Sequence, residues 1–537
     1  MLAKALFFLL NILHGSYLTA FCLSKKGRFL CALILGIAGS LGYAPYDLWI
    51  VTLGALTLLL VLLSGLKSKG AMFFTVLTFF TALFATSLSW LNFVMEGFGQ
   101  MNAAMSWFCT VLLSMYLALH YAFFSIPAFS FSRGKKAAFI CFFMPAAIAA
   151  ADFSSGVLFT GFPWMYLGNT ALSGPFSAFL PLSGARGTGI LMSLCAGCVA
   201  MAALRRYLFL PFAGVIVFAG LMLQSVQYTK DGVSISTACV QGNIPQSIRL
   251  SQAGIQSSVA VYWDLSRELL GKFDMVVWPE AALPFYMNDA MELLSDLNAA
   301  AASKKSALVT GVLRRDGEEK RNSIVVLGDT QDRAGDEDQG VGRIQYYDKR
   351  YLVPFGEFVP FAEVLRPLGR IFQIPMSDFK APQNAQLPLN IKGIKFIPAI
   401  CYEAIFPEAP LAFDDDEAGA ILMISNDAWF GTTRGPYEHF NIARIRAMEL
   451  QKPMLRVTNN GITALIGPDG KIVKALPRDE RAVLETKLVA RSGRTPYAEA
   501  GSYVAFVLML LLVVAGIFIS RRHVDENKEK FKELVRP

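Results

Sequence analysis

The sequence predicts a multispan α-helical membrane protein with an inserted α/β domain, and three observations support this fold class. Of the 537 residues, 54% are hydrophobic and only 17% are charged, whereas a soluble domain carries about 25% charged residues. Long apolar runs fill residues 2–223 and return at residues 502–519. The segment between them alternates short β-rich runs with helical ones, which is typical of an α/β domain.

The apolar runs predict the helices of the membrane part. Crossing the hydrocarbon core takes about 20 apolar residues. The first run is either an extra span with its N-terminus outside or a signal-like segment, because the stronger basic cluster follows it. The runs expected to cross are Leu2–Leu23, Phe29–Ala44, Leu48–Leu66, Ala71–Phe93, Ala104–Phe131, Ala137–Phe153, Gly187–Leu204, Leu208–Leu223 and Ser502–Ile519.

Lysine and arginine collect in alternate loops, which predicts the orientation of the chain. Basic clusters occur at residues 25–28, 67–69, 133–136 and 205–206, while the intervening loops Tyr43–Asp47 and Glu96–Asn102 contain neither residue type. Because short basic loops face the cytoplasm, the domain after Leu223 is expected outside it. Arg521 and Arg522 then return the C-terminal tail to the cytoplasm.

Four regions follow from these patterns. We expect an extra N-terminal span or signal-like segment at 1–27, a transmembrane helical bundle at 28–226, an extracytoplasmic catalytic α/β domain at 227–490, and a C-terminal transmembrane helix with a basic tail at 491–537. Within the α/β domain, helices are expected at Gln256–Leu270, Ala290–Lys304 and His439–Gln451. Strands are expected at Ser234–Val240, Met275–Trp278, Ala307–Val312, Ser323–Leu327, Phe396–Ile400, Ala420–Ser425, Met454–Val457 and Ala464–Ile466.

The cysteines and the net charge exclude several classes of function. Cys195-x-x-Cys198 has a metal or redox spacing, but inside an apolar helix without a nearby His or second pair it indicates packing. Cys239 lies in the middle of a predicted strand, so a Cys239–Cys401 disulfide is not expected. The net charge of +8 fits basic cytoplasmic loops and gives no reason to expect nucleic acid. No metal or cofactor is expected.

Three residues each follow a short apolar run that predicts a strand: Glu280 after FDMVVWP, Lys349 after RIQYYD and Cys401 after KFIPAI. Together they supply a base, a cation and a thiol. A thiol attacks a carbonyl as thiolate, so acyl transfer needs a nearby base. Lys349 would stabilise the developing oxyanion. The base is either Glu280 or His439, the one histidine of the α/β domain, which alternatively packs at the start of a helix.

The motifs around these residues are similar to those of a known family. WPEAALPF, YDKRYLVPFGEFVPF and AICYEAIFPE resemble the three active-site blocks of the nitrilase superfamily, which implies an αββα sandwich. TGFPWMYLGNT, VQGNIPQS, ISNDAWFG and TNNGITALIGPDG further resemble the apolipoprotein N-acyltransferases of bacterial envelopes. The resemblance runs from about Arg28 to Ile519, and the added N-terminal run departs from the family's pattern.

The resemblance implies a ping-pong reaction in the bacterial inner membrane, with the catalytic domain on the periplasmic side. Glu280 would take the proton of Cys401, whose thiolate attacks a phospholipid ester, and Lys349 would support the oxyanion. The resulting thioester would acylate the α-amino group of a diacylglyceryl-lipoprotein acceptor. Glu357 would orient Lys349, and Tyr402 and Glu403 would bind substrate, Glu403 being alternatively a surface carboxylate.

Two other functions share part of this pattern. A membrane-tethered amidase or nitrilase-type hydrolase would use the same triad with water in place of the amine. A transporter or receptor would use the outer domain only to bind a ligand. Transporters generally place ionisable residues within their spans, whereas these spans are nearly free of charge, with Asp152 as the main exception, which counts against a transport path. The apolar segment Tyr351–Met376, beside Lys349, is either packed away or a lid at the lipid interface. Its position favours the lid and, with it, a lipid substrate.

Overall fold

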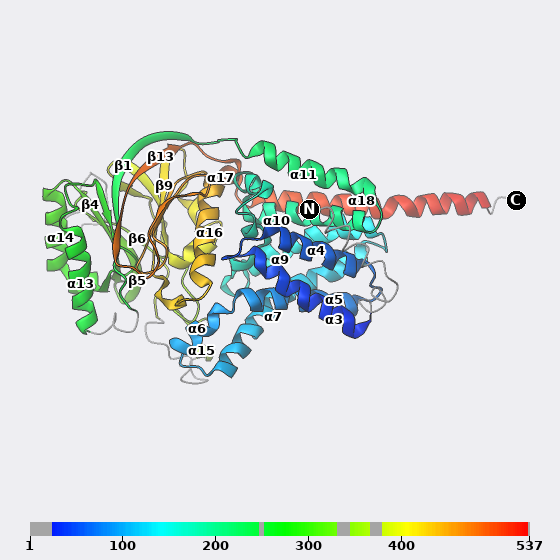
Figure 1. Cartoon of the computed structure of the whole chain (residues 1–537), viewed down its shortest axis with the longest axis horizontal. Helices are drawn as coiled ribbons and strands as arrows, with labels where there is room; N and C mark the ends of the chain where they lie inside the picture. The colour runs from blue at the N-terminus through cyan, green and yellow to red at the C-terminus, as the bar shows by residue number, and fades with distance from the viewer. Residues whose placement is uncertain (1–23, 246–251, 330–343, 366–377, 535–537) are drawn as a thin grey trace. The chain divides into compact units, whose positions relative to one another are not determined.

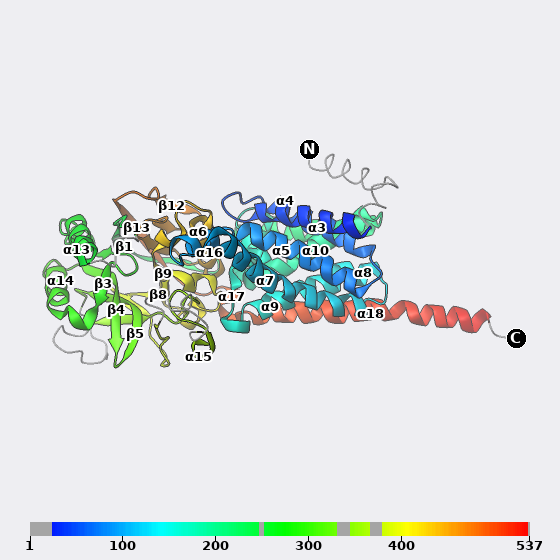
Figure 2. The same cartoon turned by 90° about the horizontal axis from the view of Figure 1, so that it is seen from below.

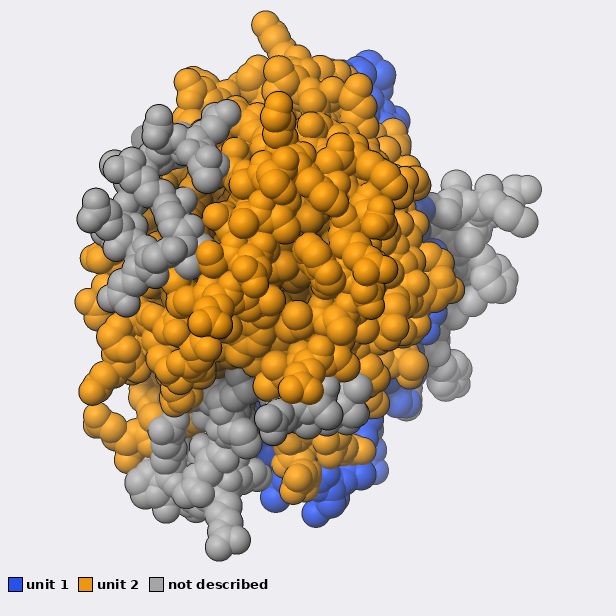
Figure 3. All heavy atoms as spheres, turned by 90° about the vertical axis from the view of Figure 1, so that its left-hand side faces the viewer, with its two compact units in different colours: residues 1–92, 101–226, 502–537 blue, residues 93–100, 227–501 orange. Residues whose placement is uncertain are grey.

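The computed structural model describes residues 24–245, 252–329, 344–365 and 378–534, and it divides into two compact units. Unit 1 is made of residues 1–92, 101–226 and 502–537, and unit 2 of residues 93–100 and 227–501 (Figure 3). The expected first span, Leu2–Leu23, lies outside the described residues. Unit 2 extends past the expected boundary at residue 490, because a strand and a short helix beyond it still pack within this unit.

Unit 1 is helical, and each predicted span among the described residues overlaps one of its helices (Figures 1 and 2). Five segments are long and apolar enough to cross a membrane: Lys69–Ser87, Ala103–Phe131, Lys136–Ser155, Pro175–Ala203 and Tyr503–Arg521. The protein is therefore a membrane protein. The helices are α3 (Lys25–Gly39), α4 (Trp49–Ser64), α5 (Lys69–Ser87), α7 (Ala103–Phe131), α8 (Lys136–Ala138), α9 (Met144–Ser155), α10 (Leu180–Ala203), α11 (Leu210–Leu223) and α18 (Tyr503–Leu534). Helix α6 (Trp90–Gly97) is divided between the units, with residues 93–97 in unit 2.

Small residues inside unit 1 allow its helices to pack closely, as is common in membranes. A methyl group added at Gly197 on α10 would lie 2.7 Å from the carbonyl oxygen of Ile140. Cys195 and Cys198 are buried on the same helix. Large apolar side chains are exposed on the outside of the unit, for example Phe506 and Leu511 of α18. An apolar outer surface around a close-packed interior suits a lipid environment.

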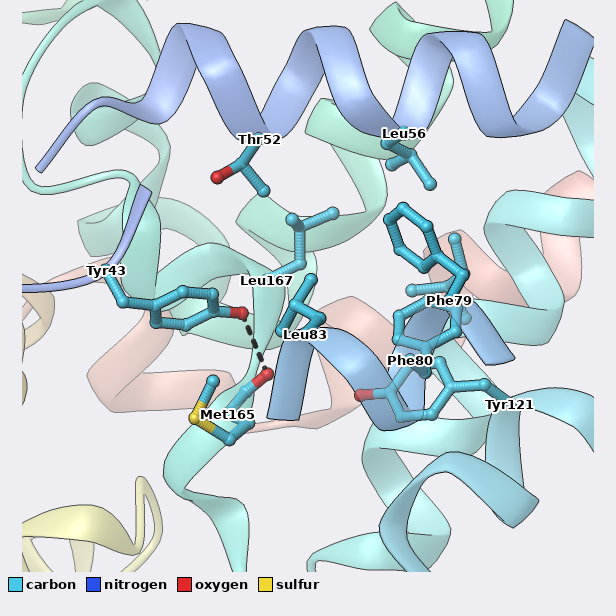
Figure 4. A pocket seen from close by; sticks show the side chains of 10 residues that line it. Tyr43, Thr52, Leu56, Phe79, Phe80, Leu83, Tyr121, Met165 and Leu167 are labelled. Carbon is cyan, nitrogen blue, oxygen red and sulfur yellow. Dashed lines mark hydrogen bonds between the residues drawn. The ribbon is translucent and has the colours of Figure 1, made fainter. Parts of the chain in front are cut away.

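A small cavity of about 20 Å³ lies inside unit 1 (Figure 4). Apolar side chains line most of it, and the hydroxyl of Tyr43 donates to the carbonyl of Met165 at 3.1 Å. The hydroxyl of Tyr121, also on the lining, donates to the buried carboxylate of Asp152. A space of this size holds about one water molecule, which is too little for a lipid or a peptide.

Unit 2 contains two β-sheets. The first has the order β13-β1-β2-β4-β5-β6, with β3 paired to β4, and the second has the order β12-β11-β10-β9-β8-β7. The strands of the first are β1 (Lys230–Gln241), β2 (Met275–Val277), β3 (Leu283–Tyr286), β4 (Ala307–Asp316), β5 (Glu319–Leu327), β6 (Gln345–Asp348) and β13 (Ala482–Ser492). Those of the second are β7 (Leu389–Ile391), β8 (Ile394–Ile400), β9 (Ala418–Ser425), β10 (Met454–Thr458), β11 (Ala464–Ile466) and β12 (Ile472–Ala475).

Helices cover the outer face of each sheet, which confirms the αββα sandwich (Figures 1 and 2). Helices α13 (Gln252–Ser266) and α14 (Met291–Ser303) pack on the first sheet, and α16 (Gly435–Leu450) packs on the second. Side chains alternate along the first sheet as a strand requires. Met275 and Val277 of β2 join the core between the sheets, while Val276 joins the core under α13 and α14.

Cys239 of β1 belongs to the core between the two sheets and is fully buried. Both Cys239 and Cys401 are free thiols, so no disulfide joins them. The short helix α17 (Pro496–Ala500) ends unit 2 and contacts α16. This contact explains why the boundary of unit 2 falls after β13 rather than within it.

Candidate active site

The three candidate catalytic residues each follow the end of a strand, and two of these strands, β2 and β6, run the same way in one sheet. Glu280 follows β2, Lys349 follows β6 and Cys401 follows β8. Strands β2 and β4 are parallel, and β6 points along β4 because two successive antiparallel pairings separate them. The structure therefore brings Glu280 and Lys349, 69 residues apart in sequence, within hydrogen-bonding distance.

The turn that carries Glu280 packs tightly on the neighbouring strand. The backbone N–H of Trp278 donates to the carbonyl of Val309 at 2.8 Å, and that of Gly311 donates to Pro279 at 3.3 Å. A methyl group at Gly311 would lie 2.4 Å from the nitrogen of Ala281. Only glycine fits at this position of β4, and the missing side chain allows the Glu280 turn to lie directly against this strand.

Lys349 lies between two carboxylates. Its Nζ is 2.9 Å from Oε1 of Glu357 and 3.4 Å from Oε1 of Glu280. The side-chain amide of Asn322 donates to the same two oxygens, at 2.9 Å and 2.8 Å. Glu280 also accepts the backbone N–H of Asn426 at 2.9 Å. The cluster holds Glu280 and Lys349 at fixed positions beside one another.

Burial and charge act in opposite directions on Lys349. Burial alone lowers the pKa of its ammonium group, but the charges of Glu357, Glu280 and Cys401 outweigh burial and raise this pKa above its ordinary value. Lys349 is therefore cationic at any working pH. A permanent buried cation beside a thiol can stabilise negative charge that develops during attack on a carbonyl.

Cys401 starts a turn of 3₁₀ helix immediately after β8 and has a left-handed backbone, with a φ of 51°. Such a conformation is uncommon for a residue with a side chain and often marks a functional site. Burial raises the pKa of the Cys401 thiol, the charge of Glu280 raises it further, and the charge of Lys349 opposes both. The resting residue is a thiol, so attack on a carbonyl requires a base.

The ring of His439 bonds to the backbone of Cys401 and to the carboxylate of Asp427. Its Nε2 is 3.0 Å from the backbone carbonyl of Cys401, and its Nδ1 is 3.1 Å from Oδ1 of Asp427. Both ring nitrogens are thus engaged away from the sulfur. Glu280 is the candidate base that remains, since its charge acts directly on the pKa of the Cys401 thiol.

Glu403 is buried, so the surface alternative for this residue is wrong. Its Oε1 accepts from the Tyr347 hydroxyl and the Arg350 N–H, both at 2.7 Å, and from the Tyr351 N–H at 3.3 Å. Its Oε2 accepts the N–H of Ile400 at 2.8 Å. Glu403 thereby joins the backbone after Lys349 to the backbone before Cys401.

Tyr402 is buried beside Glu403. Its ring packs edge-to-face on Phe406, with the ring centroids 5.4 Å apart. Of the expected lid, residues 366–376 lie outside the described residues. In its described part, Val353 donates its N–H to Oε2 of Glu357 at 2.8 Å, and Phe355 and Phe361 are exposed.

Sequence reasoning missed Asn322 and Asp427 as members of this region. Asn322 precedes the apolar run of β5, and its burial becomes visible only in the folded sheet, so no local sequence signal identified it. The role of Asp427 depends on contacts with His439 and Arg456 from distant segments, which no local pattern contains. Among the described residues, no group of three or more His, Cys, Asp or Glu side chains is placed to hold a metal.

Two stacked sheets between layers of helices, with a glutamate, a lysine and a cysteine at their strand ends, are typical of a carbon–nitrogen hydrolase domain. The family model described as Carbon-nitrogen hydrolase matches residues 236–497, and the one described as Apolipoprotein N-acyltransferase N-terminal domain matches residues 35–198. The chain joins the two parts in one polypeptide.

Curated relatives match nearly the whole chain. An Apolipoprotein N-acyltransferase of Shewanella oneidensis is 36% identical, covering 92% of this chain and 96% of its own. A relative of the same name from Vibrio cholerae is 36% identical and covers 88% of this chain and 93% of its own. Another, from Haemophilus influenzae, is 32% identical and covers 93% of this chain and 97% of its own. The chain belongs to the apolipoprotein N-acyltransferase family and is an enzyme.

Proposed function

We propose that this enzyme transfers a fatty acyl group from a membrane phospholipid, through a thioester on Cys401, to the α-amino group of the N-terminal diacylglyceryl-cysteine of apolipoproteins. One observation carries the proposal. The chain that contains membrane-crossing helices also places Lys349 between Glu280 and Glu357, and the charges of Lys349 and Glu280 act on the thiol of Cys401. The relatives are named apolipoprotein N-acyltransferases, which supports an acyl transfer to nitrogen on an apolipoprotein.

In the first half-reaction Glu280 removes the thiol proton as the sulfur of Cys401 attacks the ester carbonyl. A C–S bond forms, and the negative charge on the carbonyl oxygen is stabilised by Lys349. The C–O bond to the glycerol then breaks, and Glu280 returns the proton to the leaving alkoxide. The products are a lysophospholipid and an acylated Cys401. A base is necessary because the pKa of the thiol is raised.

In the second half-reaction the acceptor amine attacks the thioester. Glu280 takes a proton from the amine as the C–N bond forms. The C–S bond then breaks, and Glu280 returns this proton to the sulfur of Cys401, which leaves as a thiol. The same Lys349 stabilises the second oxyanion. The site thus uses one base and one cation twice, and only the nucleophile changes between the two steps.

The remaining site residues hold this arrangement in place. Glu357 orients Lys349 through a 2.9 Å contact. Glu403, for which a substrate-binding role was expected, directs its carboxylate at four donors of the chain itself, so we assign it to positioning of the Lys349 and Cys401 turns. Tyr402 is buried with it, and we assign it to packing behind the nucleophile.

The proposal places the enzyme in the bacterial inner membrane, with unit 2 on the periplasmic side. The alternation of basic and neutral loops supports this orientation. Protease treatment of spheroplasts tests it, with an epitope tag inserted at the exposed Gly317 turn between β4 and β5. Loss of the tag without membrane disruption is expected, and protection of the tag would reverse the orientation.

Incubation of the purified enzyme with phospholipid carrying a labelled acyl chain, together with a diacylated lipopeptide, tests the reaction. Label is expected first on Cys401 and then on the peptide amine, by mass spectrometry. Cys401→Ala is expected to show neither. Cys401→Ser is expected to be nearly inactive, since a hydroxyl is much harder to ionise than a thiol. Label found only as free fatty acid would identify a membrane-tethered hydrolase instead.

A further inference from the structure

We propose that His439 is the positioning residue of the nucleophile: it holds the backbone carbonyl of Cys401 and so fixes the left-handed turn from which the thiol acts. This inference rests on the proposed role of Cys401. The imidazole Nε2 lies 3.0 Å from the carbonyl oxygen of Cys401. A carbonyl can only accept a hydrogen bond, so Nε2 carries the proton and donates.

The ring is fixed from its other side. Nδ1 of His439 is 3.1 Å from Oδ1 of Asp427 and 3.2 Å from Nη2 of Arg456. A charged ring donates from Nδ1 to Asp427, and a neutral ring accepts at Nδ1 from Arg456. In both states Nε2 keeps its proton. The bond to Cys401 is therefore independent of the charge on His439.

Asp427 and Arg456 form a buried support for this ring. Nη2 of Arg456 donates to Oδ2 of Asp427 at 2.7 Å, and the hydroxyl of Ser425 donates to Oδ1 at 2.9 Å. His439, Asp427 and Arg456 are all almost completely buried. A methyl group at Gly461 would lie 2.2 Å from Oδ2 of Asp427, so a glycine is required where the chain passes this carboxylate.

The network links three elements of unit 2 to the nucleophile. His439 is on α16, Asp427 follows β9 and Arg456 is on β10. Asn426, directly before Asp427, donates its N–H to Glu280 at 2.9 Å. The turn after β9 therefore contacts the base, Glu280, through Asn426. It contacts the nucleophile, Cys401, through Asp427 and His439. This turn sets the position of Glu280 relative to Cys401.

Because the peptide bond is planar, the hydrogen bond from His439 to the Cys401 carbonyl affects the reaction. The Cys401 carbonyl and the Tyr402 N–H belong to one planar trans unit and point in opposite directions. Holding the carbonyl fixes the direction of that N–H and the position of the Cys401 Cα. Without the bond from His439, the unit can rotate and displace the thiol from Glu280.

Two substitutions of His439 separate this role from a general contribution to packing. The side-chain amide of Gln reaches the position of Nε2, so His439→Gln retains a donor to Cys401 and loses the contact with Asp427. The amide of Asn reaches only the position of Nδ1, so His439→Asn retains the contact with Asp427 and loses the hydrogen bond to the Cys401 carbonyl. The two variants have the same functional group and differ by one methylene.

The test uses the full-length protein in nanodiscs and measures acylation of Cys401 by two donors, p-nitrophenyl butyrate and phospholipid. His439→Asn and His439→Ala are expected to lower the maximal acylation rate roughly 10- to 100-fold, because a displacement of about 1 Å has an effect of that size. KM is expected to change little, and His439→Gln is expected to stay within about threefold of the wild type. His120→Gln in unit 1, where His120 contacts Ser154, serves as the matched control and is expected to react normally.

Equal rates for the Gln and Asn variants, whether both fast or both slow, would overturn the proposal, as would a fast Asn variant beside a slow Gln variant. Thermal unfolding of each variant is recorded in parallel. If wild-type Cys401 reacts with the nitrophenyl ester but not with phospholipid, the proposed donor is wrong, while the comparison of the variants still decides the role of His439. If neither donor acylates Cys401, both proposals fail.

Discussion

At the scale of single residues, burial raises the pKa of the Cys401 thiol most, and two neighbouring opposite charges modify it. The charge of Glu280 raises the pKa of the thiol and that of Lys349 lowers it, both on top of the rise caused by burial. The two groups also form an ion pair with each other, with Nζ and Oε1 3.4 Å apart. Their effects on the thiol can be separated by removing one charge at a time.

We expect Glu280→Gln to lower the pKa of the Cys401 thiol and Lys349→Met to raise it, because each substitution removes one of these charges. Alkylation of Cys401 by iodoacetamide should therefore begin at a lower pH in the first variant and at a higher pH in the second. Peptide mass spectrometry across pH 6–10 measures this, with the exposed Glu318→Gln as control. Both variants should lose acyl transfer. Shifts of the same sign would contradict the assignment.

Glu403 gives a second prediction at this scale. Glu403→Gln keeps the size of the side chain but places an NH₂ group against backbone donors, so at least one buried donor loses its acceptor. Such a loss costs about 1–3 kcal/mol. We expect a lower unfolding temperature and slower acylation of Cys401, measured by calorimetry and by single-turnover kinetics. A variant as stable as Glu318→Gln would contradict the positioning role.

The residue scale also shows what a sequence can reveal. Glu280, Lys349 and Cys401 were identifiable because each follows an apolar strand and combines with the others into a known chemistry. Asn322 and Asp427 were not, because their contacts are with residues of other elements: Glu280 after β2 for Asn322, and His439 on α16 for Asp427. The same holds for Glu403: its position beside Cys401 suggested a substrate contact, whereas its partners lie within the chain.

At the scale of elements, the close approach of β4 to the Glu280 turn depends on Gly311. We expect Gly311→Ala to displace this turn, since the added methyl group would lie 2.4 Å from the nitrogen of Ala281 and 2.8 Å from Cα of Glu280. Overpacking of this kind costs about 1–3 kcal/mol. The rate of Cys401 acylation should fall by a larger factor than the loss of folded protein accounts for.

Gly214→Ala provides the control for Gly311, because a methyl group added at Gly214 on α11 meets open space. This variant should retain normal rates and an unchanged unfolding temperature. Normal acylation in Gly311→Ala would show that the turn tolerates displacement. In that case, the position of Glu280 would be set by its hydrogen bonds from Asn322 and Asn426.

Elements were predicted well where the apolar pattern was long or alternating. The run at Ala104–Phe131 corresponds to α7, Ala103–Phe131, and the strand expected at Phe396–Ile400 corresponds to β8. Helix α16 begins at Gly435, earlier than the expected His439, because its first turn contains Gly and Pro, which are weak helix signals. The pairing order of the strands depends on contacts between distant segments and could not be derived from local pattern.

At the scale of the whole molecule, the two units have separate interiors. In unit 1, Nη1 of Arg186 donates to the hydroxyl of Ser502 at 2.8 Å and its Nη2 donates to the hydroxyl of Tyr166 at 2.7 Å. Ser502 lies directly before α18, so this buried arginine joins the last helix to α10. The core between the sheets of unit 2 contains neither residue.

We expect Arg186→Met to loosen unit 1 and leave unit 2 intact. The buried hydroxyl of Tyr166 and the half-buried hydroxyl of Ser502 each lose a partner. The loss at the buried hydroxyl costs about 1–3 kcal/mol. Hydrogen exchange should become faster in α10 and α18 and stay unchanged in β8, β9 and β10, as measured by mass spectrometry. The exposed Arg133→Met should change neither. Faster exchange throughout unit 2 would show that the units unfold together.

The sealed position of Cys239 has a consequence for the lifetime of the enzyme under oxidising conditions. Unit 2 contains only two cysteines, and one of them is enclosed between two sheets with no exposed surface. The nucleophile therefore has no second sulfur in its own unit with which to form an internal bridge. A disulfide between the two cysteines of unit 2 would require Cys239 to leave the core between the sheets.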